Sequence, residues 1–214
     1  MPRPFTAMTS VIGDACVAPT GDNPMQDIKP AILLFLAFTI ICGGIYPAVI
    51  TGIAQAVFPK QALGSFITDK SGKDLGSSLI GQPFSDPKYF WLRPSATADF
   101  PYNPLASGGS NAGPTNPAYL QTVAERVKAL RDSGIAGPLP AELVQASASG
   151  LDPHITPESA RLQVARVAKA RGVSEDMLIK AVAHATEGRQ LGFLGEPRVN
   201  VLALNLSLDL MKQY

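Results

Sequence analysis

The sequence has little cysteine, little histidine and almost no net charge. Its 214 residues include 2 cysteines and 2 histidines, and 18 basic residues nearly balance 17 acidic ones, for a net charge of +1. No group of these residues resembles a zinc site, so we expect no metal. So balanced a charge provides no field that would steer nucleic acid. The length predicts one compact domain with an additional anchor.

A long uncharged run is the clearest feature that is present. No charged residue occurs between Pro30 and Pro59, and the run is mainly Ile, Leu, Phe, Val, Ala and Gly. It exceeds the roughly 20 residues that cross a bilayer core, where the backbone must be helical to pair its own amides. We therefore predict a transmembrane helix over residues 28–59, with Pro30 in its first turn. Pro47 predicts a kink or a break.

Two alternatives compete with a retained membrane helix. A soluble core helix would show a polar face, but only Thr39, Thr51 and Gln55 interrupt the run. A cleaved signal peptide is favoured by residues 54–56, Ala-Gln-Ala, which mimic a cleavage site. The run is longer than the roughly 7 to 15 apolar residues of such peptides, which favours retention. Residues 1–27 show no helical or strand period, as is typical of a mobile tail.

Residues 60–214 predict a soluble α+β domain with about three helices and a short sheet. Residues 64–81 predict a hairpin that turns at residues 69–72. We expect short strands at 89–92 and 199–206, the second buried on both faces. Capping residues and apolar spacing predict three helices, from Asn116 to Gly134, from Thr156 to Gly172 and from Ser174 to Gly188.

Candidate catalytic groups are few, and we expect no catalytic residue. Residues 69–73, Asp-Lys-Ser-Gly-Lys, resemble the phosphorylated DKTGT sequence of P-type ATPases. The chain has no room for the nucleotide-binding domain that this chemistry needs, so a hairpin turn is favoured. Ser149, Asp152 and His154 leave a hydrolase triad as an alternative, although their close spacing disfavours alignment. The remaining charges of this region predict a solvated or interface surface: Glu187, Arg189, Glu196 and Arg198.

A glycine-rich segment over residues 107–117 is the candidate binding loop. Its small residues let the backbone approach itself or a partner closely, and the amides of such loops can bind anions. Its Ser-Gly-Gly resembles the signature loop of ABC ATPases, while the GxxxxGK[ST] phosphate loop does not occur. The candidates for nucleotide binding are Ser107, Gly108, Gly109, Ser110, Asn111 and Gln121.

Short words in a fixed order extend from about Ile28 to Leu210. They are Tyr46-Pro47, Thr51-Gly52, Gly76-Ser77, Leu79-Ile80-Gly81-Gln82, Tyr89-Phe90, Arg93-Pro94-Ser95, Ser107-Gly108-Gly109-Ser110-Asn111, Gly113-Pro114, Asn116-Pro117, Ala148-Ser149-Gly150-Leu151-Asp152-Pro153-His154-Ile155, Arg166-Val167-Ala168 and Gly195-Glu196-Pro197-Arg198-Val199-Asn200-Val201-Leu202. In these words the chain closely resembles KdpC, the C-subunit family of the Kdp potassium-transporting P-type ATPase of bacteria and archaea. Glu142 and Gln145 depart from the family pattern, and the segment before Ile28 is unusually long for it.

The resemblance implies a non-catalytic accessory subunit of an ATP-driven potassium import complex in the bacterial cytoplasmic (inner) membrane. The implied partners are the channel-like potassium-binding subunit KdpA, the ATP-hydrolysing subunit KdpB and the small membrane subunit KdpF. It also implies an N-terminus inside and residues 60–214 outside the cytoplasm. The lysine count slightly favours the opposite orientation, although large domains translocate largely regardless of charge.

Family accounts describe such a subunit as a catalytic chaperone that raises the ATP affinity of the hydrolysing subunit. ATP is cytoplasmic, so a domain across the membrane acts on it only through a coupling free energy carried by membrane helices. The accessory subunit is the first hypothesis. A direct nucleotide-binding regulator that uses the candidate loop is the second, and an anchored extracytoplasmic hydrolase is the third.

Overall fold

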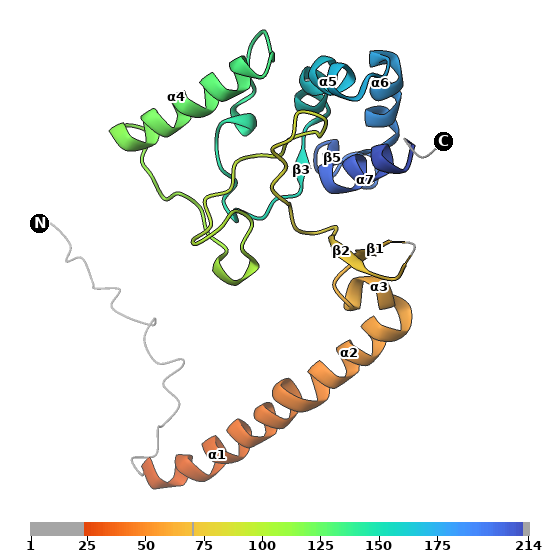
Figure 1. The fold of residues 1–214 in the computed structure, drawn as a ribbon. Helices are drawn as coiled ribbons and strands as arrows, with labels where there is room; N and C mark the ends of the chain where they lie inside the picture. Colours follow the sequence, from red (N-terminus) through yellow and green to blue (C-terminus); the bar gives the residue numbers. More distant parts are fainter. Residues whose placement is uncertain (1–23, 70, 212–214) are drawn as a thin grey trace, which may run out of the picture. The chain divides into compact units, whose positions relative to one another are not determined.

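The computed structural model describes residues 24–69 and 71–211 (Figure 1). It divides into two compact units at the boundary between Pro59 and Lys60. The first unit is a long apolar helix in three parts. α1 (Pro24–Ile40) leads into a π-helical turn, η1 (Ile41–Ile45), which continues as α2 (Tyr46–Val57).

A π-helical turn, and not a break in the helix, ends two residues before Pro47, where we expected a kink or a break. Proline has no amide to donate, and its ring crowds the carbonyl four residues earlier. The amide of Tyr46 donates to the carbonyl of Ile41, five residues back, and the helix continues beyond it. A wider turn of this kind accommodates the proline without ending the helix.

The helix also starts earlier than predicted. Pro30 lies inside α1 and not in its first turn, because α1 begins at Pro24. Residues 24–27 of the predicted tail are therefore helical, and the rest of that prediction, residues 1–23, lies outside the described residues.

The helical span Asp27–Val57 is long and apolar enough to cross a membrane, and none of its most apolar stretch is buried within the described chain. Its 31 residues correspond to roughly 46 Å at about 1.5 Å per residue, more than the hydrocarbon core of about 30 Å. A soluble core helix would be covered by other elements. The uncovered apolar surface favours a lipid environment.

The second unit begins with α3 (Pro59–Ala62), most of which lies beyond the boundary, and the predicted hairpin. β1 (Phe66–Thr68) pairs antiparallel with β2 (Asp74–Ser77). Asp69 closes the turn, because its Oδ1 accepts the hydroxyl of Ser71 at 2.6 Å and the amides of Ser71 and Lys73 at 2.8 and 2.9 Å. The Ser71 hydroxyl is the main reason that the pKa of Asp69 is lowered. The hairpin is confirmed, and its aspartate serves the turn.

The three predicted helices are present, and capping side chains begin them as expected. Asn116 accepts the amides of Ala118 and Tyr119, Thr156 accepts that of Ser159, and Ser174 accepts that of Met177. The helices are α4 (Pro117–Asp132), α5 (Pro157–Arg171) and α6 (Glu175–His184). α6 ends before the predicted Gly188, because β4 (Thr186–Glu187) follows at once.

The strand predicted at 199–206 is wrong beyond Asn200. β5 (Arg198–Asn200) is the centre of an antiparallel sheet of order β3-β5-β4, with β3 at His154–Ile155. α7 (Val201–Met211) follows immediately, and Asn200 Oδ1 accepts the amide of Ala203 at 3.0 Å, as a helix cap does. Leucines at every second position imitate a strand, but the helix buries Val201, Leu204 and Leu208 at helical spacing.

The strand predicted at 89–92 is also wrong, because no backbone ladder forms there among the described residues. Two buried side-chain amides replace it. Asn205 accepts the amide of Phe90 at 2.9 Å and donates to its carbonyl at 3.0 Å. Gln163 does the same for Trp91, at 2.7 and 3.0 Å. We call Gln163 and Asn205, which are 0% and 1% exposed, the amide clamps.

Two arginines reinforce the clamped segment. Arg166 stacks on the Trp91 ring, 3.8 Å from its centroid, and donates to the Pro87 carbonyl at 2.7 Å and to Gln163 at 2.7 Å. Burial lowers the pKa of Arg166 to about 10, which leaves it charged at neutral pH. Arg171 donates to the Lys88 carbonyl at 2.6 Å. Segment 87–91 is therefore bound to the helices by side chains along its length.

Two hydrophobic cores result. The larger surrounds Phe90 and joins α5, α6, α7 and β5, which lie together in Figure 1. The smaller lies under α4, where Leu130 and Ile135 contact Leu143 and Val144 at the end of η3 (Ala141–Leu143). Trp91 and Leu162 pack against the smaller core. Another short 3-10 helix is η2 (Pro104–Ala106).

The amide clamps predict a large difference between two otherwise identical substitutions. Gln163→Leu leaves the buried amide and carbonyl of Trp91 unpaired, so it should lower the free energy of unfolding by about 2–5 kcal/mol. Gln121→Leu replaces an exposed residue of α4 and should change the free energy of unfolding by less than about 0.5 kcal/mol. Denaturation of the full chain in detergent, followed by Trp91 fluorescence, measures both. Equal effects would contradict the clamp.

The uncovered helix predicts a retained anchor. After alkaline extraction of cell membranes, the chain should stay with the lipid and dissolve only in detergent, because the described residues bury none of the most apolar part of its helix. Its mass should equal that of the full sequence. Recovery in the aqueous fraction would contradict the anchor, and a product shortened after residue 56 would favour the signal peptide.

Candidate functional site

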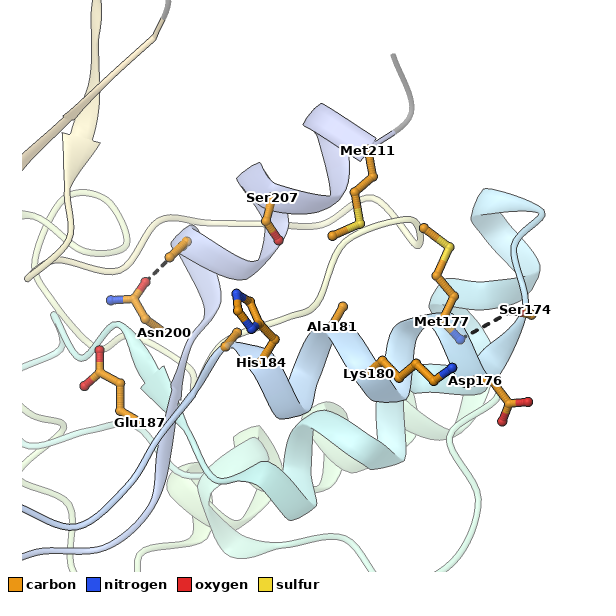
Figure 2. Close-up of a pocket in the computed structure, with 12 residues that line it drawn as sticks. Ser174, Asp176, Met177, Lys180, Ala181, His184, Glu187, Asn200, Ser207 and Met211 are labelled. Carbon is orange, nitrogen blue, oxygen red and sulfur yellow. Dashed lines mark hydrogen bonds between the residues drawn. The ribbon is translucent and has the colours of Figure 1, made fainter. Parts of the chain in front are cut away.

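A groove of about 730 Å³ lies between α6, α7 and the ends of β4 and β5 (Figure 2). Met177 and Ala181 line it from α6, and Met211 lines it from the last turn of α7. Charges of both signs accompany them, including Lys180 and Glu187. Methionine side chains adapt readily to another apolar surface, but no group of like charges among the lining residues converges on a small ligand.

The candidate loop packs against the chain itself. The hydroxyl of Ser107 and the amide of Gly108 both donate to the Ser149 carbonyl, at 3.0 Å each. A Cβ on Gly109 would lie 3.1 Å from the Ala148 carbonyl oxygen, and one on Gly150 would lie 2.9 Å from that of Gly108. The glycines are needed because two loops approach each other closely.

The remaining candidates do not converge with this contact. Ser110 accepts the amide of Ala112 at 3.5 Å, and Asn111 is exposed with a positive φ of 49°. Gln121 lies on α4, where it donates to Glu125 at 3.0 Å. Residues 100–124 contain no charged residue, so the loop itself offers no cation to a phosphate group.

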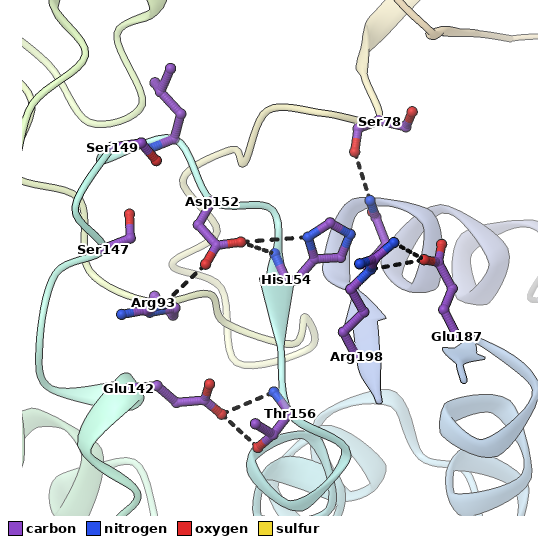
Figure 3. Close-up of polar contacts among 12 residues, drawn as sticks. Ser78, Arg93, Glu142, Ser147, Ser149, Asp152, His154, Thr156, Glu187 and Arg198 are labelled. Carbon is purple, nitrogen blue, oxygen red and sulfur yellow. Dashed lines mark hydrogen bonds and ion pairs between the residues drawn. The ribbon is translucent and has the colours of Figure 1, made fainter. Parts of the chain in front are cut away.

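The three residues of the triad alternative, Ser149, Asp152 and His154, also contact their own neighbours in the chain. Asp152 accepts Arg93 at 3.0 Å and lies 3.5 Å from Nδ1 of His154, which also places its amide on Asp152 at 3.0 Å (Figure 3). The Ser149 hydroxyl instead accepts the amide of Leu151 at 3.1 Å, and Figure 3 shows it on the side of Asp152 away from His154. The carboxylate is held, but the serine is not aligned with the imidazole.

Asp152 remains ionised because of these neighbours. Burial alone raises its pKa, but the hydrogen bonds from His154 and the charge of Arg93 outweigh burial and lower the pKa below its usual value. Tyr102 donates its hydroxyl to the Arg93 carbonyl at 2.6 Å, and burial raises the pKa of that hydroxyl. Because the pKa of Asp152 is lowered, its ionised carboxylate stabilises the fold at pH values above its unfolded-state pKa. This stability is lost as the pH falls through the folded-state pKa. The cluster thus holds the turn before β3.

Glu142 has a clear structural contact. Its Oε1 accepts the amide of Thr156 at 2.9 Å and the hydroxyl of Thr156 at 2.6 Å (Figure 3). It therefore fixes the residue that caps α5.

In residues 24–69 and 71–211, no three His, Cys, Asp or Glu side chains gather as a metal site would require.

Sequence reasoning missed an apolar surface between β4 and β5. The charges predicted to be a solvated or interface surface form ion pairs there, Arg189 with Glu196 at 2.8 Å and Arg198 with Glu187 at 2.9 Å. Between them, three large apolar residues are exposed: Leu191, Phe193 and Leu194. The signal available in the sequence is their position among the closely spaced glycines 188, 192 and 195, which disfavours a buried helix or strand and favours a turn.

Comparison with known proteins identifies the family. Residues 28–210 match the family model described as KdpC: K+-transporting ATPase, c chain. The Potassium-transporting ATPase KdpC subunit of Geobacter sulfurreducens is 71% identical over 185 residues, which cover 86% of this chain and 98% of the relative. The subunit of the same name from Methylococcus capsulatus is 58% identical over 190 residues, which cover 88% of this chain and all of the relative.

These matches cover nearly all described residues, from α1 to α7, and confirm the resemblance drawn from the sequence words. The chain belongs to the KdpC family, the c chain of the K+-transporting ATPase.

Proposed function

We propose that the chain is an anchored accessory subunit of an ATP-driven potassium import complex. One observation carries this proposal. The same chain has an apolar helix that its described residues leave uncovered, and a second unit whose candidate polar groups bind one another, as Arg93 binds Asp152 and Ser107 binds the Ser149 carbonyl. The relatives are named as subunits of a potassium-transporting ATPase. A chain of this kind acts by binding and stabilising its partners.

The partners that the family implies are the potassium-binding KdpA, the ATP-hydrolysing KdpB and the small KdpF, in the bacterial cytoplasmic (inner) membrane. We propose that residues 28–59 span this membrane with the N-terminus inside, and that residues 60–214 lie outside the cytoplasm. There the domain stabilises the assembly and shapes the outer approach of potassium. The exposed apolar residues between β4 and β5 and the groove beside α6 supply surfaces for such contacts.

We further propose that the chain raises the ATP affinity of the hydrolysing subunit indirectly. ATP and an extracytoplasmic domain lie on opposite sides of the membrane, so the effect is a coupling free energy between two sites. Such couplings are typically 1–3 kcal/mol, about 5–150-fold in affinity. The internal contacts of the candidate loop, including Ser107 and Gly108 with Ser149, favour neither direct nucleotide binding nor hydrolysis.

Removal of residues 60–214 tests the accessory role. The truncated chain should give less assembled complex, a weaker apparent affinity for potassium, and a KM for ATP raised by about 5-fold or more, because the coupling is lost. Transport and ATP hydrolysis in membrane vesicles measure these values. Full assembly with both affinities unchanged would refute the role.

Cysteine labelling in intact cells tests the orientation. The 2 cysteines of the chain lie outside residues 60–214, so both can be replaced before a single new one is introduced. Leu105→Cys, at a position 95% exposed, should react with a membrane-impermeant maleimide in intact cells. The matched Asp27→Cys, at the other end of the helix, should react only after the cells are opened. The reverse pattern would place the domain inside.

A further inference from the structure

The segment from β4 to β5 forms a narrow hairpin whose end is fixed by backbone contacts. Gln190 and Leu194 exchange two hydrogen bonds, each 2.9 Å, and the Phe193 amide donates to the Gln190 carbonyl at 3.2 Å. The two residues between Gln190 and Phe193 are Leu191 and Gly192, and they have positive φ values of 52° and 82°. A type I′ turn requires positive φ at both positions.

The side chains at this end are large, apolar and exposed. Leu191, Phe193 and Leu194 are 83%, 70% and 48% exposed, and we call these three residues the apolar tip. Single exposed apolar residues are ordinary on a protein surface. Three within one tight turn form a patch, and such patches mark sites of interaction.

Leu191 adds a conformational argument. Positive φ suits glycine and asparagine, and a bulky residue is strained there. Turns of this type prefer Asn or Gly at that position. The turn gains nothing from a side chain that is 83% exposed. Strain of this kind points to function, because burial of the leucine by another molecule would offset it.

The charges beside the apolar tip are neutralised within the hairpin. Arg189 pairs with Glu196, and Arg198 pairs with Glu187 as Figure 3 shows. Basic and acidic groups are equal in number, so the hairpin offers little attraction to an anionic lipid surface. The surface complementary to the apolar tip and its neutralised charges is an uncharged apolar pocket on a folded protein.

We propose that the apolar tip docks into an apolar pocket on another protein subunit of the potassium-transporting ATPase, with Leu191 and Phe193 as its anchors. The inference rests on the proposed function, which supplies the assembly. A turn already closed by its own hydrogen bonds loses little freedom on docking, so most of the gain from apolar contact is retained.

The first test compares Leu191→Asn with Leu105→Asn in the full chain, produced together with the other subunits. Asparagine tolerates positive φ, so Leu191→Asn should keep or raise the Tm of the chain in detergent. Recovery of the other ATPase subunits on the tagged chain should fall at least tenfold. Leu105 is 95% exposed and lies outside the hairpin, so Leu105→Asn should leave recovery unchanged.

The second test identifies what the apolar tip contacts. A photo-reactive benzoylphenylalanine in place of Phe193 should crosslink to a protein subunit of the ATPase in the native membrane. Crosslinking to lipid alone would overturn the proposal. If Leu191→Asn lowers the Tm, Phe193→Ser replaces it, since that variant leaves both positive-φ residues in place, and unchanged recovery with it would equally overturn the proposal.

The unaltered chain separates the two possible failures. If it retrieves no ATPase subunit, the proposed function fails and the docking inference fails with it. If it and Leu191→Asn retrieve the subunits equally, the accessory role stands and the docking inference alone is refuted.

Discussion

The second unit, which begins at Lys60, depends on how the buried backbone at Phe90 and Trp91 is paired. A buried amide or carbonyl without a partner costs about 1–3 kcal/mol, and this segment passes through the larger core with no neighbouring strand among the described elements. The amide clamps meet that requirement from two directions, Gln163 on α5 and Asn205 on α7. Two helices distant in the sequence are thereby fixed to one extended segment.

This pairing explains which parts of the fold the sequence could predict. The starts of α4, α5 and α6 depend on caps within a few residues, such as Asn116 and Thr156, and local chemistry of this kind is readable. The hairpin at Asp69 is readable for the same reason. The segment at 89–92 is not, because its partners lie 72 and 115 residues away.

α7 shows how a correct observation led to a wrong element. Its leucines recur at every second position, a pattern that matches a strand, and the mainly apolar residues 199–206 predicted a strand buried on both faces. In the structure the helix places the buried side chain of Asn205 against the backbone of Phe90. Asn200 caps the start of that helix. Tertiary pairing decided the element, and only the cap at Asn200 was open to local reasoning.

The candidate binding loop stays a prediction, and its internal contacts have a simple physical reason. Glycine, serine and asparagine in a loop permit close approach by any backbone, and here the Ser107–Asn111 loop is approached by residues 148–150 of the same chain. Small residues therefore do not distinguish a ligand from an internal neighbour. An exposed apolar side chain at positive φ, such as that of Leu191, is a more specific indication of a binding site, because neither contact with solvent nor packing within its own fold stabilises it. For a chain proposed to act by binding partners, exposed residues that the fold itself does not use are the first candidates for that function.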